Sequence, residues 1–418
     1  MTDNAVVAGR AAVEEVRRTQ DAMWHDTWLP EETVALRAEC RAAVAQTVAP
    51  VARRIGQQAE SVDSFPWDAF RGLAGAGLFA VPFDAEFGRG LEHPMLGACT
   101  VTEEIAYQSS SMAGVYDGQC ILVPQALSFA TDELRARLLP PLISGAEAFS
   151  FATTEPNASS DLSVDALETV AEPVEGGFVV DGRKRWITNS VVASWAAVLC
   201  RTGNRMNMLM IDLKNSPGIR IGAPDLKMGH RGQLTADIVL EGVFVPEGNL
   251  LGEPGAGLSV ALSCLTRGRI GIGAAGVGVA QAALDLAVHR LRTRQLFGGP
   301  LGKMQYWQFK MAERATEIEC ARTLYQKAAL RLDRGDRTAE PEAAMAKAFG
   351  TRIAVDTVRD SMQIHGGYGF AREVAETGES VRLEELYRDA KILEIFEGAN
   401  ELQQWVIARR LIGRDVTG

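Results

Sequence analysis

The stretch GGFVVDGRKRWIT, residues 176–188, marks the point at which the chain changes from helical to β-type sequence. It consists of an apolar run, an Asp-Gly pair that is typical of tight turns, and a second run, so it predicts a β-hairpin. Four further runs of β type follow it: WAAVLCR, MNMLMIDL, GIRIG and TADIVLEGVFVP. The sequence therefore predicts a β domain in the middle of the chain.

Helical sequence lies on both sides of this β domain. Before it, residues 31–150 carry apolar side chains at helical spacing. After it, the segment Met304–Leu332 has an apolar side chain at every third or fourth position, which is the pattern of a bundle helix. Further helices are predicted at residues 270–293, 342–362 and 401–412. The predicted fold class is α+β, with an N-terminal extension (1–30), an all-α N-terminal domain (31–150), a β-barrel-like middle domain (151–262) and a C-terminal four-helix bundle (263–418).

The composition is that of a soluble globular protein. The 418 residues include 43 Lys and Arg against 53 Asp and Glu, and the formal net charge of −10 argues against general binding to nucleic acid or anionic membranes. The six cysteines are scattered singly, without the paired spacing of a zinc site, and the N-terminus lacks the apolar core of a signal peptide. We expect a cytoplasmic protein without a structural metal.

The segment GIGAAG, residues 271–276, fits the G-x-G-x-x-G pattern of dinucleotide-binding folds. That pattern needs a strand before it and an acidic residue about twenty positions later. Here CLTRGRI stands where the strand is needed, and Leu296 stands where the acidic residue is needed. We interpret these glycines as helix residues that allow close packing against a neighbour.

Five motifs, taken together, resemble the acyl-CoA dehydrogenase family. They are FATTEPNASSD (151–161), DGRKRWITN (181–189), RTRQLFGGPL (292–301), MQIHGGYGF (362–370) and YRDAKILEIFEGANELQQWVIARR (387–410). The motifs follow one another in the family's order, and the resemblance covers nearly the whole chain from about residue 31. The family's helical, β and helical domains agree with the division made above.

The resemblance implies an enzyme that holds FAD between the β domain and the C-terminal bundle. Such an enzyme oxidises an acyl-CoA to the trans-2-enoyl-CoA, as in fatty acid β-oxidation. A base removes the α-proton while the β-hydride goes to flavin N5, and electrons pass on to an electron-transfer flavoprotein or a similar acceptor. The site must stabilise enolate character with hydrogen bonds to the thioester carbonyl and must exclude water.

The family's base position corresponds to Glu397 in IFEGANELQQW (395–405). Phe396 beside it supplies apolar surface, and Gly398 leaves room for the substrate. Apolar surroundings would raise the pKa of the carboxyl group and make it a stronger base. The resemblance also makes the backbone N–H of Glu397 a donor to the thioester carbonyl. Some relatives carry the base on the first bundle helix, at a position that is Gly268 here.

The helix that follows offers an alternative explanation of Glu397. Asn400 and Gln403 form an N-x-x-Q pattern that predicts a capping box at the start of that helix. Glu397 would then lie just ahead of the helix and serve only to complement its dipole. The two explanations predict different effects of removing the carboxylate.

The resemblance assigns further residues to the cofactor and the substrate. Those that would frame the flavin ring are Phe151, Thr154, Trp186 and Thr188. Ser160 would lie near the pyrophosphate and the pantetheine arm. Those that would reach the FAD of a neighbouring subunit are Arg294, Phe297, Gln363 and Gly367. Substrate contacts would come from Ser160, Phe396, Glu397 and Gly398. The shared cofactor site implies a homotetramer built as a dimer of dimers.

The chain departs from the family's motifs at four positions. Asn157 and Ser159 replace glycines, Leu296 stands where a polar residue is common, and Ala399 replaces a threonine. These changes leave FAD affinity open, and with it a non-catalytic partner subunit of a mixed acyl-CoA dehydrogenase as an alternative. A further alternative is a dehydrogenase or oxidase of a carrier-protein-bound acyl or aminoacyl thioester.

The acyl chain length and branching are not specified by any motif. The residues expected near the floor of the acyl pocket are Met112, Ala113, Gly114, Tyr116 and Asp117. The two small residues in this group, Ala113 and Gly114, either give the pocket depth or serve ordinary helix packing.

Overall fold

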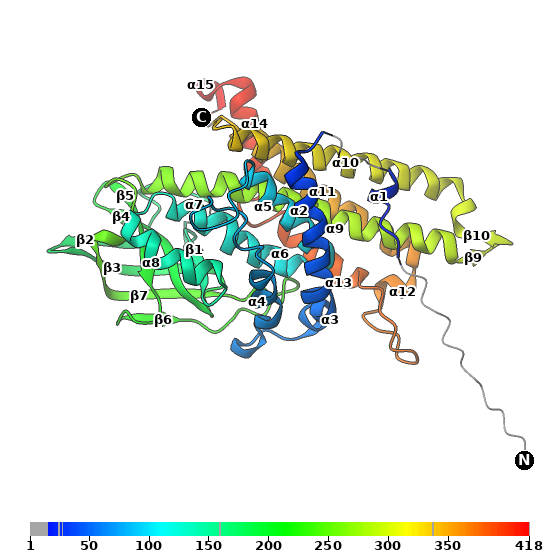
Figure 1. Ribbon diagram of the computed structural model, residues 1–418, viewed down its shortest axis with the longest axis horizontal. Coiled ribbons are helices and arrows are strands. Elements are labelled where there is room, and N and C mark those ends of the chain that lie inside the picture. Colours follow the sequence, from blue (N-terminus) through cyan, green and yellow to red (C-terminus); the bar gives the residue numbers. More distant parts are fainter. Residues whose placement is uncertain (1–15, 24–25, 27, 159, 337, 418) are drawn as a thin grey trace, which may run out of the picture.

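The computed structural model describes residues 16–417, except positions 24, 25, 27, 159 and 337, and shows a helical, a β and a second helical part in sequence order (Figure 1). The sheet lies at one end of the molecule and the β9–β10 hairpin (residues 295–300) at the other, while α9 (Gly257–Thr293) runs between them. The described N-terminal helices are α1 (Gln20–Met23), α2 (Glu31–Thr47), α3 (Ala49–Gln57), η1 (Val62–Ser64), α4 (Trp67–Gly75), α5 (Pro94–Gln108), α6 (Ser110–Asp117), η2 (Gly118–Leu122), α7 (Val123–Leu127) and α8 (Asp132–Ile143).

The middle part is an eight-stranded sheet with neighbour order β6-β7-β3-β2-β4-β5-β8, and β1 pairs in parallel with β4. Its path is open among the described residues, so it is a sheet with two ends rather than a closed barrel. The strands are β1 (Ala148–Ala152), β2 (Val170–Val174), β3 (Gly177–Thr188), β4 (Ala193–Thr202), β5 (Arg205–Asp212), β6 (Ile219–Ile221), β7 (Thr235–Pro246) and β8 (Leu250–Leu251), with the short helix η3 (Glu247–Asn249) before β8.

The predicted hairpin at residues 176–188 is wrong. Residues 177–188 form one continuous strand, β3, which pairs with β2 and β7. Gly182 has a φ of 154° and lies at an irregularity of the β3–β7 register, where a Cβ would come within 2.6 Å of the Thr169 Cα. The Asp-Gly pair therefore forms a bulge, and the turn before β3 lies at residues 175–176 instead.

Small residues bring α9 close to α11 (Glu340–His365). A Cβ on Gly273 would lie 2.9 Å from the Ala346 backbone, and one on Gly276 would lie 2.5 Å from the Gly350 carbonyl oxygen. The interpretation of GIGAAG as a packing segment of a helix is confirmed. By length and composition α9 could cross a membrane, but 94% of its most apolar window is buried inside the protein, so it is the central core helix.

The C-terminal part contains a helix that the sequence pattern did not predict, α13 (Leu383–Leu393). Its buried apolar residues Leu383, Leu386, Ala390 and Leu393 keep helical spacing, and the acidic Glu385 and Asp389 are buried beside them. The predicted domain boundary at residues 262 and 263 lies inside α9. The remaining C-terminal elements are β9 (Gln295–Leu296), β10 (Gly299–Pro300), η4 (Leu301–Lys303), α10 (Gln305–Asp333), α12 (Gly367–Phe370), α14 (Asn400–Ile412) and α15 (Arg414–Thr417).

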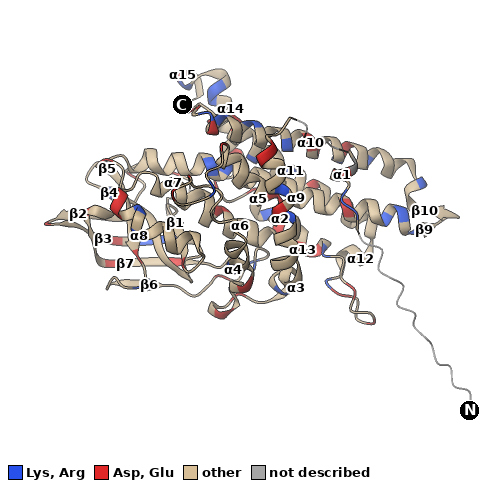
Figure 2. Ribbon diagram, in the orientation of Figure 1, with Lys and Arg blue, Asp and Glu red and all other residues tan. Residues whose placement is uncertain are grey.

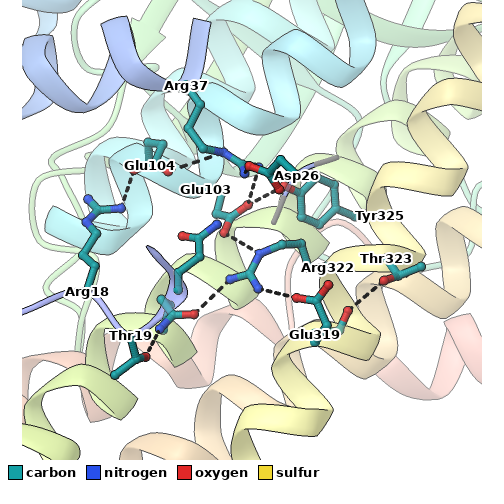
Figure 3. A network of polar contacts seen from close by, with 12 residues as sticks. Arg18, Thr19, Asp26, Arg37, Glu103, Glu104, Glu319, Arg322, Thr323 and Tyr325 are labelled. Atoms are coloured by element: carbon teal, nitrogen blue, oxygen red, sulfur yellow. Dashed lines mark hydrogen bonds and ion pairs between the residues drawn. The ribbon is translucent and has the colours of Figure 1, made fainter. Parts of the chain in front are cut away.

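A buried ionic network joins the N-terminal segment to the helical core (Figure 3). Glu103 of α5 accepts hydrogen bonds from Arg322 Nε at 3.0 Å and from the Tyr325 hydroxyl, both on α10. The adjacent Glu104 accepts one from Arg18 Nη1 at 2.5 Å. The described part of the predicted N-terminal extension is therefore held against α5, whereas residues 1–15 lie outside the described residues.

Candidate active site

The loop between α13 and α14 holds Glu397 in a rarely adopted backbone conformation. Glu397 has a φ of 56° and Gly398 a φ of 86°, so two consecutive residues occupy the left-handed region. Gln403 Nε2 donates to the Gly398 carbonyl at 2.8 Å, and a Cβ on Gly398 would lie 2.7 Å from that nitrogen. The turn therefore requires glycine at position 398, and the strain at Glu397 suggests a function for its side chain.

The predicted capping box at Asn400 and Gln403 is wrong. Ala399 is the N-cap of α14, and no side chain caps this helix. Asn400 Oδ1 instead accepts a hydrogen bond from Lys347 Nζ at 2.9 Å, while Gln403 bonds to the loop carbonyl described above. Both polar residues therefore fix the Glu397 loop, and Asn400 attaches it to α11.

The Glu397 carboxylate lies against the bare backbone of α9. A Cβ added to Gly268 would come within 2.8 Å of Glu397 Oε2 and 2.7 Å of Leu122 Cδ2. This Oε2 is buried and has no hydrogen-bond partner among the described residues. Burial raises the pKa of Glu397 to about 7, although the charges of Arg269 and Lys347 lower it. Such a carboxylate can act as a general base near neutral pH.

Two buried cations face this carboxylate from α9 and α11. Lys347 Nζ also donates to the Glu394 carbonyl at 3.0 Å, and burial lowers the pKa of this lysine to about 7. Arg269 forms an ion pair with Glu340 at 3.6 Å. Both cations favour the ionised form of Glu397, so they limit the rise of its pKa that burial causes.

Strands β1 and β3 bring together the residues predicted to frame the flavin. The backbone N–H of Arg185 donates to the Thr154 carbonyl at 2.8 Å, which joins the segment after β1 to β3. The Thr188 carbonyl accepts a hydrogen bond from Ser150 Oγ at 2.8 Å, and the half-buried Phe151 follows on β1. These positions therefore lie on adjoining backbone although they are far apart in sequence.

Trp186 is held in an unusual position on β3. Its φ is 60°, the β3–β7 register is irregular between Lys184 and Ile187, and its side chain is 52% exposed. The Arg185 guanidinium lies 3.8 Å from its ring centroid. The buried ion pair of Lys184 with Glu155, at 2.7 Å, fixes the strand just before it. An exposed, rigidly held indole ring is suited to contact a planar ligand.

The signature loop after β1 is only partly described. Ser160, predicted near the pyrophosphate, is exposed there, and Asn157 Nδ2 donates to Glu168 Oε1 at 2.9 Å. Ser159, which replaces a family glycine, lies outside the described residues. The loop is thus open to solvent where the cofactor and the pantetheine arm are predicted to pass.

His230 is part of the site although no sequence motif singled it out. Its buried ring lies edge-on to Phe396, with centroids 5.7 Å apart, and its Nδ1 lies 2.9 Å from Gln233 Oε1. Its Nε2 lies 2.7 Å from Ser110 Oγ, and its backbone N–H donates to Asp389. Burial lowers the pKa of His230, so the ring is neutral and donates from Nδ1 to the glutamine. The histidine therefore connects the segment before β7 to α6 and α13, and its ring packs against Phe396 in the Glu397 loop.

The residues expected at the acyl pocket floor differ in their surroundings. Met112 and Ala113 are buried in the hydrophobic core, and the Tyr116 hydroxyl donates to the Leu78 carbonyl at 3.0 Å. A Cβ on Gly114 would lie 2.9 Å from Gln233 Nε2. Gly114 therefore allows close packing against Gln233, and Ala113 is part of the core.

A cavity of about 230 Å³ lies between the start of α5, α7 and α9. Its lining includes Met95, Ile121 and Arg267. Neither Glu397 nor Trp186 lines this cavity, so the cavity is not the centre of the candidate site.

The second predicted cofactor group lies at the far end of α9. Arg294 follows the last residue of this helix, and Phe297 occupies the turn of the β9–β10 hairpin with a φ of 50° and a side chain that is 91% exposed (Figure 1). Gln363 and Gly367 are exposed at the junction of α11 and α12. The structure therefore separates these four residues from the group on β1 and β3 within one chain.

Comparison with known proteins places these features in a family. Models of the acyl-CoA dehydrogenase N-terminal, middle and C-terminal domains match residues 30–146, 150–243 and 255–412. A 3-(aryl)acrylate reductase of Clostridium sporogenes is 35% identical over 389 residues, which span 91% of this chain and 99% of the relative. The human mitochondrial short-chain specific acyl-CoA dehydrogenase is 33% identical over 411 residues, spanning 97% and 96%.

Solved structures agree with the sequence comparison. Butyryl-CoA dehydrogenase from Megasphaera elsdenii has a TM-score of 0.84 and 28% identity, and the match covers 92% of this chain and 99% of that one. A glutaryl-CoA dehydrogenase in complex with glutaryl-CoA has a TM-score of 0.84 and 30% identity, covering 93% and 98%. The chain therefore belongs to the acyl-CoA dehydrogenase family of oxidoreductases.

Proposed function

We propose that this protein uses FAD to dehydrogenate an acyl-CoA thioester between its α- and β-carbons, with Glu397 as the base that removes the α-proton. The observation that carries the proposal is the Glu397 carboxylate itself. It is held by a left-handed turn, lies against bare backbone at Gly268, and has an unpartnered oxygen and a pKa raised by burial. A residue that only complements a helix dipole needs none of these features.

The loop also offers a donor for the thioester carbonyl. Among the described residues, the backbone N–H of Glu397 donates no hydrogen bond within the protein. A donor to the thioester oxygen would stabilise the negative charge that develops there as the α-proton leaves. Phe396 and Leu122 supply apolar surface beside the carboxylate and help to exclude water.

The protein residues fit an FAD whose site is shared between subunits. The exposed Trp186 and the backbone around Thr154 and Thr188 suit a flavin ring. The second group lies at the other end of α9, and 37 helical residues span about 55 Å. When bound, FAD supplies the acceptor for the hydride that leaves the β-carbon. We infer a homotetramer in the cytoplasm that passes electrons to a flavoprotein acceptor and serves fatty acid β-oxidation.

The charge distribution supports a dinucleotide at that second end. The chain is acidic overall, yet basic residues gather at the C-terminal end of α9 beside β9 and β10 (Figure 2). Arg290, Arg292 and Arg294 follow one another there on alternate positions. A local cluster of this kind can attract a pyrophosphate that the whole chain would repel.

Replacing Arg294 by alanine should lower both the FAD content and the oligomeric fraction of the purified protein. The exposed Arg334→Ala at the end of α10 is the matched control, because it removes the same charge from a helix end outside this cluster and should leave both quantities unchanged. Flavin absorbance per chain and light scattering after size-exclusion chromatography measure the two effects. A wild-type protein that is colourless, monomeric and unable to bind added FAD would contradict the proposal and favour the partner-subunit alternative.

Flavin reduction by the substrate should become faster as the pH rises and reach half of its maximum rate near pH 7. Burial raises the pKa of Glu397 to about 7, and only the ionised carboxylate can accept the α-proton. The pH dependence of the rate constant, measured anaerobically at saturating acyl-CoA, checks this sign. A midpoint at the ordinary glutamate value of about 4.3 would show that the carboxylate is solvated in the working enzyme.

A further inference from the structure

A second buried carboxyl group lies beside the candidate site and has no partner. Asp117, the last residue of α6, is 2% exposed, and its Oδ1 is buried without a hydrogen-bond partner among the described residues. A Cβ on Gly271 would lie 2.2 Å from this oxygen and 2.7 Å from Ile121 Cδ1. The carboxyl group is therefore aimed at bare backbone of α9, as the carboxylate of Glu397 is at Gly268.

The two carboxyl groups face glycines that lie about one helical turn apart on α9. Gly268 and Gly271 are three residues apart on α9, so their Cα atoms are separated by about 5 Å. Asp117 is followed directly by the π-helical turn η2, a distortion that is frequent at functional sites. An acyl chain whose α-carbon lies at Glu397 would therefore bring a hydroxyl group on its fifth carbon close to Asp117, because three carbon–carbon bonds and one carbon–oxygen bond span about the same distance.

The protonation of Asp117 decides which group it can bind. Burial raises the pKa of Asp117 well above its ordinary value, and the negative charge of Glu397 raises it further. No cation faces this carboxyl among the described residues, and its neighbours include the thiols of Cys99 and Cys120. Burial and the charge of Glu397 therefore both favour the neutral form of Asp117, and a neutral carboxyl group both donates and accepts a hydrogen bond.

We propose that Asp117 is a specificity residue of the acyl pocket and that the enzyme takes acyl thioesters with a hydroxyl group on the fourth or fifth carbon of the chain. A hydroxyl group also donates and accepts, so it would satisfy the buried carboxyl that the unliganded protein leaves unpaired. An unsubstituted chain would leave that group buried against methylene groups, which is unfavourable. This inference rests on the proposed function, because it places the acyl chain by the position of Glu397.

The test compares 5-hydroxyhexanoyl-CoA with hexanoyl-CoA as reductants of the wild-type flavin under anaerobic conditions. The hydroxylated thioester should have about a tenfold higher kcat/KM, the effect of one well-placed hydrogen bond. Asp117→Asn, which still donates and accepts, should keep this preference. Asp117→Leu should reverse it, because leucine favours the unsubstituted chain.

Each result has a defined meaning. A wild-type preference for hexanoyl-CoA would overturn the inference even if Asp117→Leu failed to fold, and so would a ratio that is the same in the wild type and the leucine variant. A still stronger preference for 5-aminohexanoyl-CoA would show that Asp117 binds a cation as a carboxylate, and would overturn the hydroxyl assignment. If none of the thioesters reduces the flavin, the proposed function fails as well, whereas reduction with no discrimination removes only the role of Asp117.

Discussion

Replacing Glu397 by glutamine should lower the rate of flavin reduction by an acyl-CoA by at least about 10²- to 10⁴-fold, the usual cost of losing a positioned general base. Glutamine keeps the length and the hydrogen-bonding reach of the side chain, so the left-handed turn and the contact with Gly268 can remain. FAD content and thioester affinity should therefore change little. Steady-state dye reduction and equilibrium titration with the enoyl-CoA product measure the two sides of this prediction.

The matched control is Glu401→Gln. Glu401 is an exposed acidic residue in the first turn of α14, so its replacement removes the same charge from the same helix end without touching the carboxylate over Gly268. If Glu397 served only the helix dipole, both variants would lose about 0.3–1 kcal/mol of stability and keep their activity. The base assignment instead requires that only the Glu397 variant is inactive.

Replacing Glu103 by glutamine should destabilise the folded protein by about 3–5 kcal/mol, because it removes a buried carboxylate that faces both Arg322 and Arg37. Glu103 is 2% exposed, and Arg322 Nε donates to it at 3.0 Å (Figure 3). Burial would raise the pKa of Glu103, but Arg322 and Arg37 lower it to about 2. Its folded-state pKa is thus depressed, so this stabilisation is present above the unfolded-state pKa of about 4.3 and is lost as the pH falls toward 2.

Glu319→Gln provides the control for the network. Glu319 accepts from Arg322 Nη1 at 2.8 Å, but its side chain is 34% exposed, so its loss should cost at most about 1 kcal/mol. Thermal and denaturant unfolding of FAD-loaded protein at pH 7 would compare the two variants. Equal effects of the two substitutions would show that burial does not determine the strength of these contacts.

The order of helical and β parts was predictable because each part has its own hydrophobic period. The 29-residue helix α10 follows from its apolar spacing, whereas β3 was read as two strands because an Asp-Gly pair fits a turn and a bulge equally well. Helix α13 was missed although Leu383, Leu386, Ala390 and Leu393 keep helical spacing, because its 11 residues give only a short pattern. Local pattern therefore predicted the long helix α10 even though its buried face also contains Arg314 and Arg322.

The candidate site was predictable only where a motif carries it. Glu397 and Gly398 lie in such a motif, and the structure shows why the pair needs its backbone conformation. His230 and Lys347 act through partners on other elements, Phe396 and Asn400, so no local pattern reveals them. Asp117 was expected near the floor of the acyl pocket, but its buried oxygen without a partner among the described residues could not be predicted, because it faces a glycine more than 150 residues away in sequence. Tertiary contacts of this kind cannot be predicted from a single sequence.

Rapid mixing of FAD-loaded protein with an excess of acyl-CoA, followed at the flavin absorbance maximum without oxygen, tests the removal of the α-proton by Glu397 most directly. The wild type should lose its absorbance in a fast phase whose rate rises with pH around 7, since burial raises the pKa of Glu397 to about 7. The Glu397→Gln protein, with the same FAD content and melting behaviour, should lose it at least about 10²-fold more slowly above pH 7, where the wild-type carboxylate is ionised, and its rate should not rise with pH around 7. Reduction of the glutamine variant at nearly the wild-type rate would contradict the assignment of Glu397 as the base.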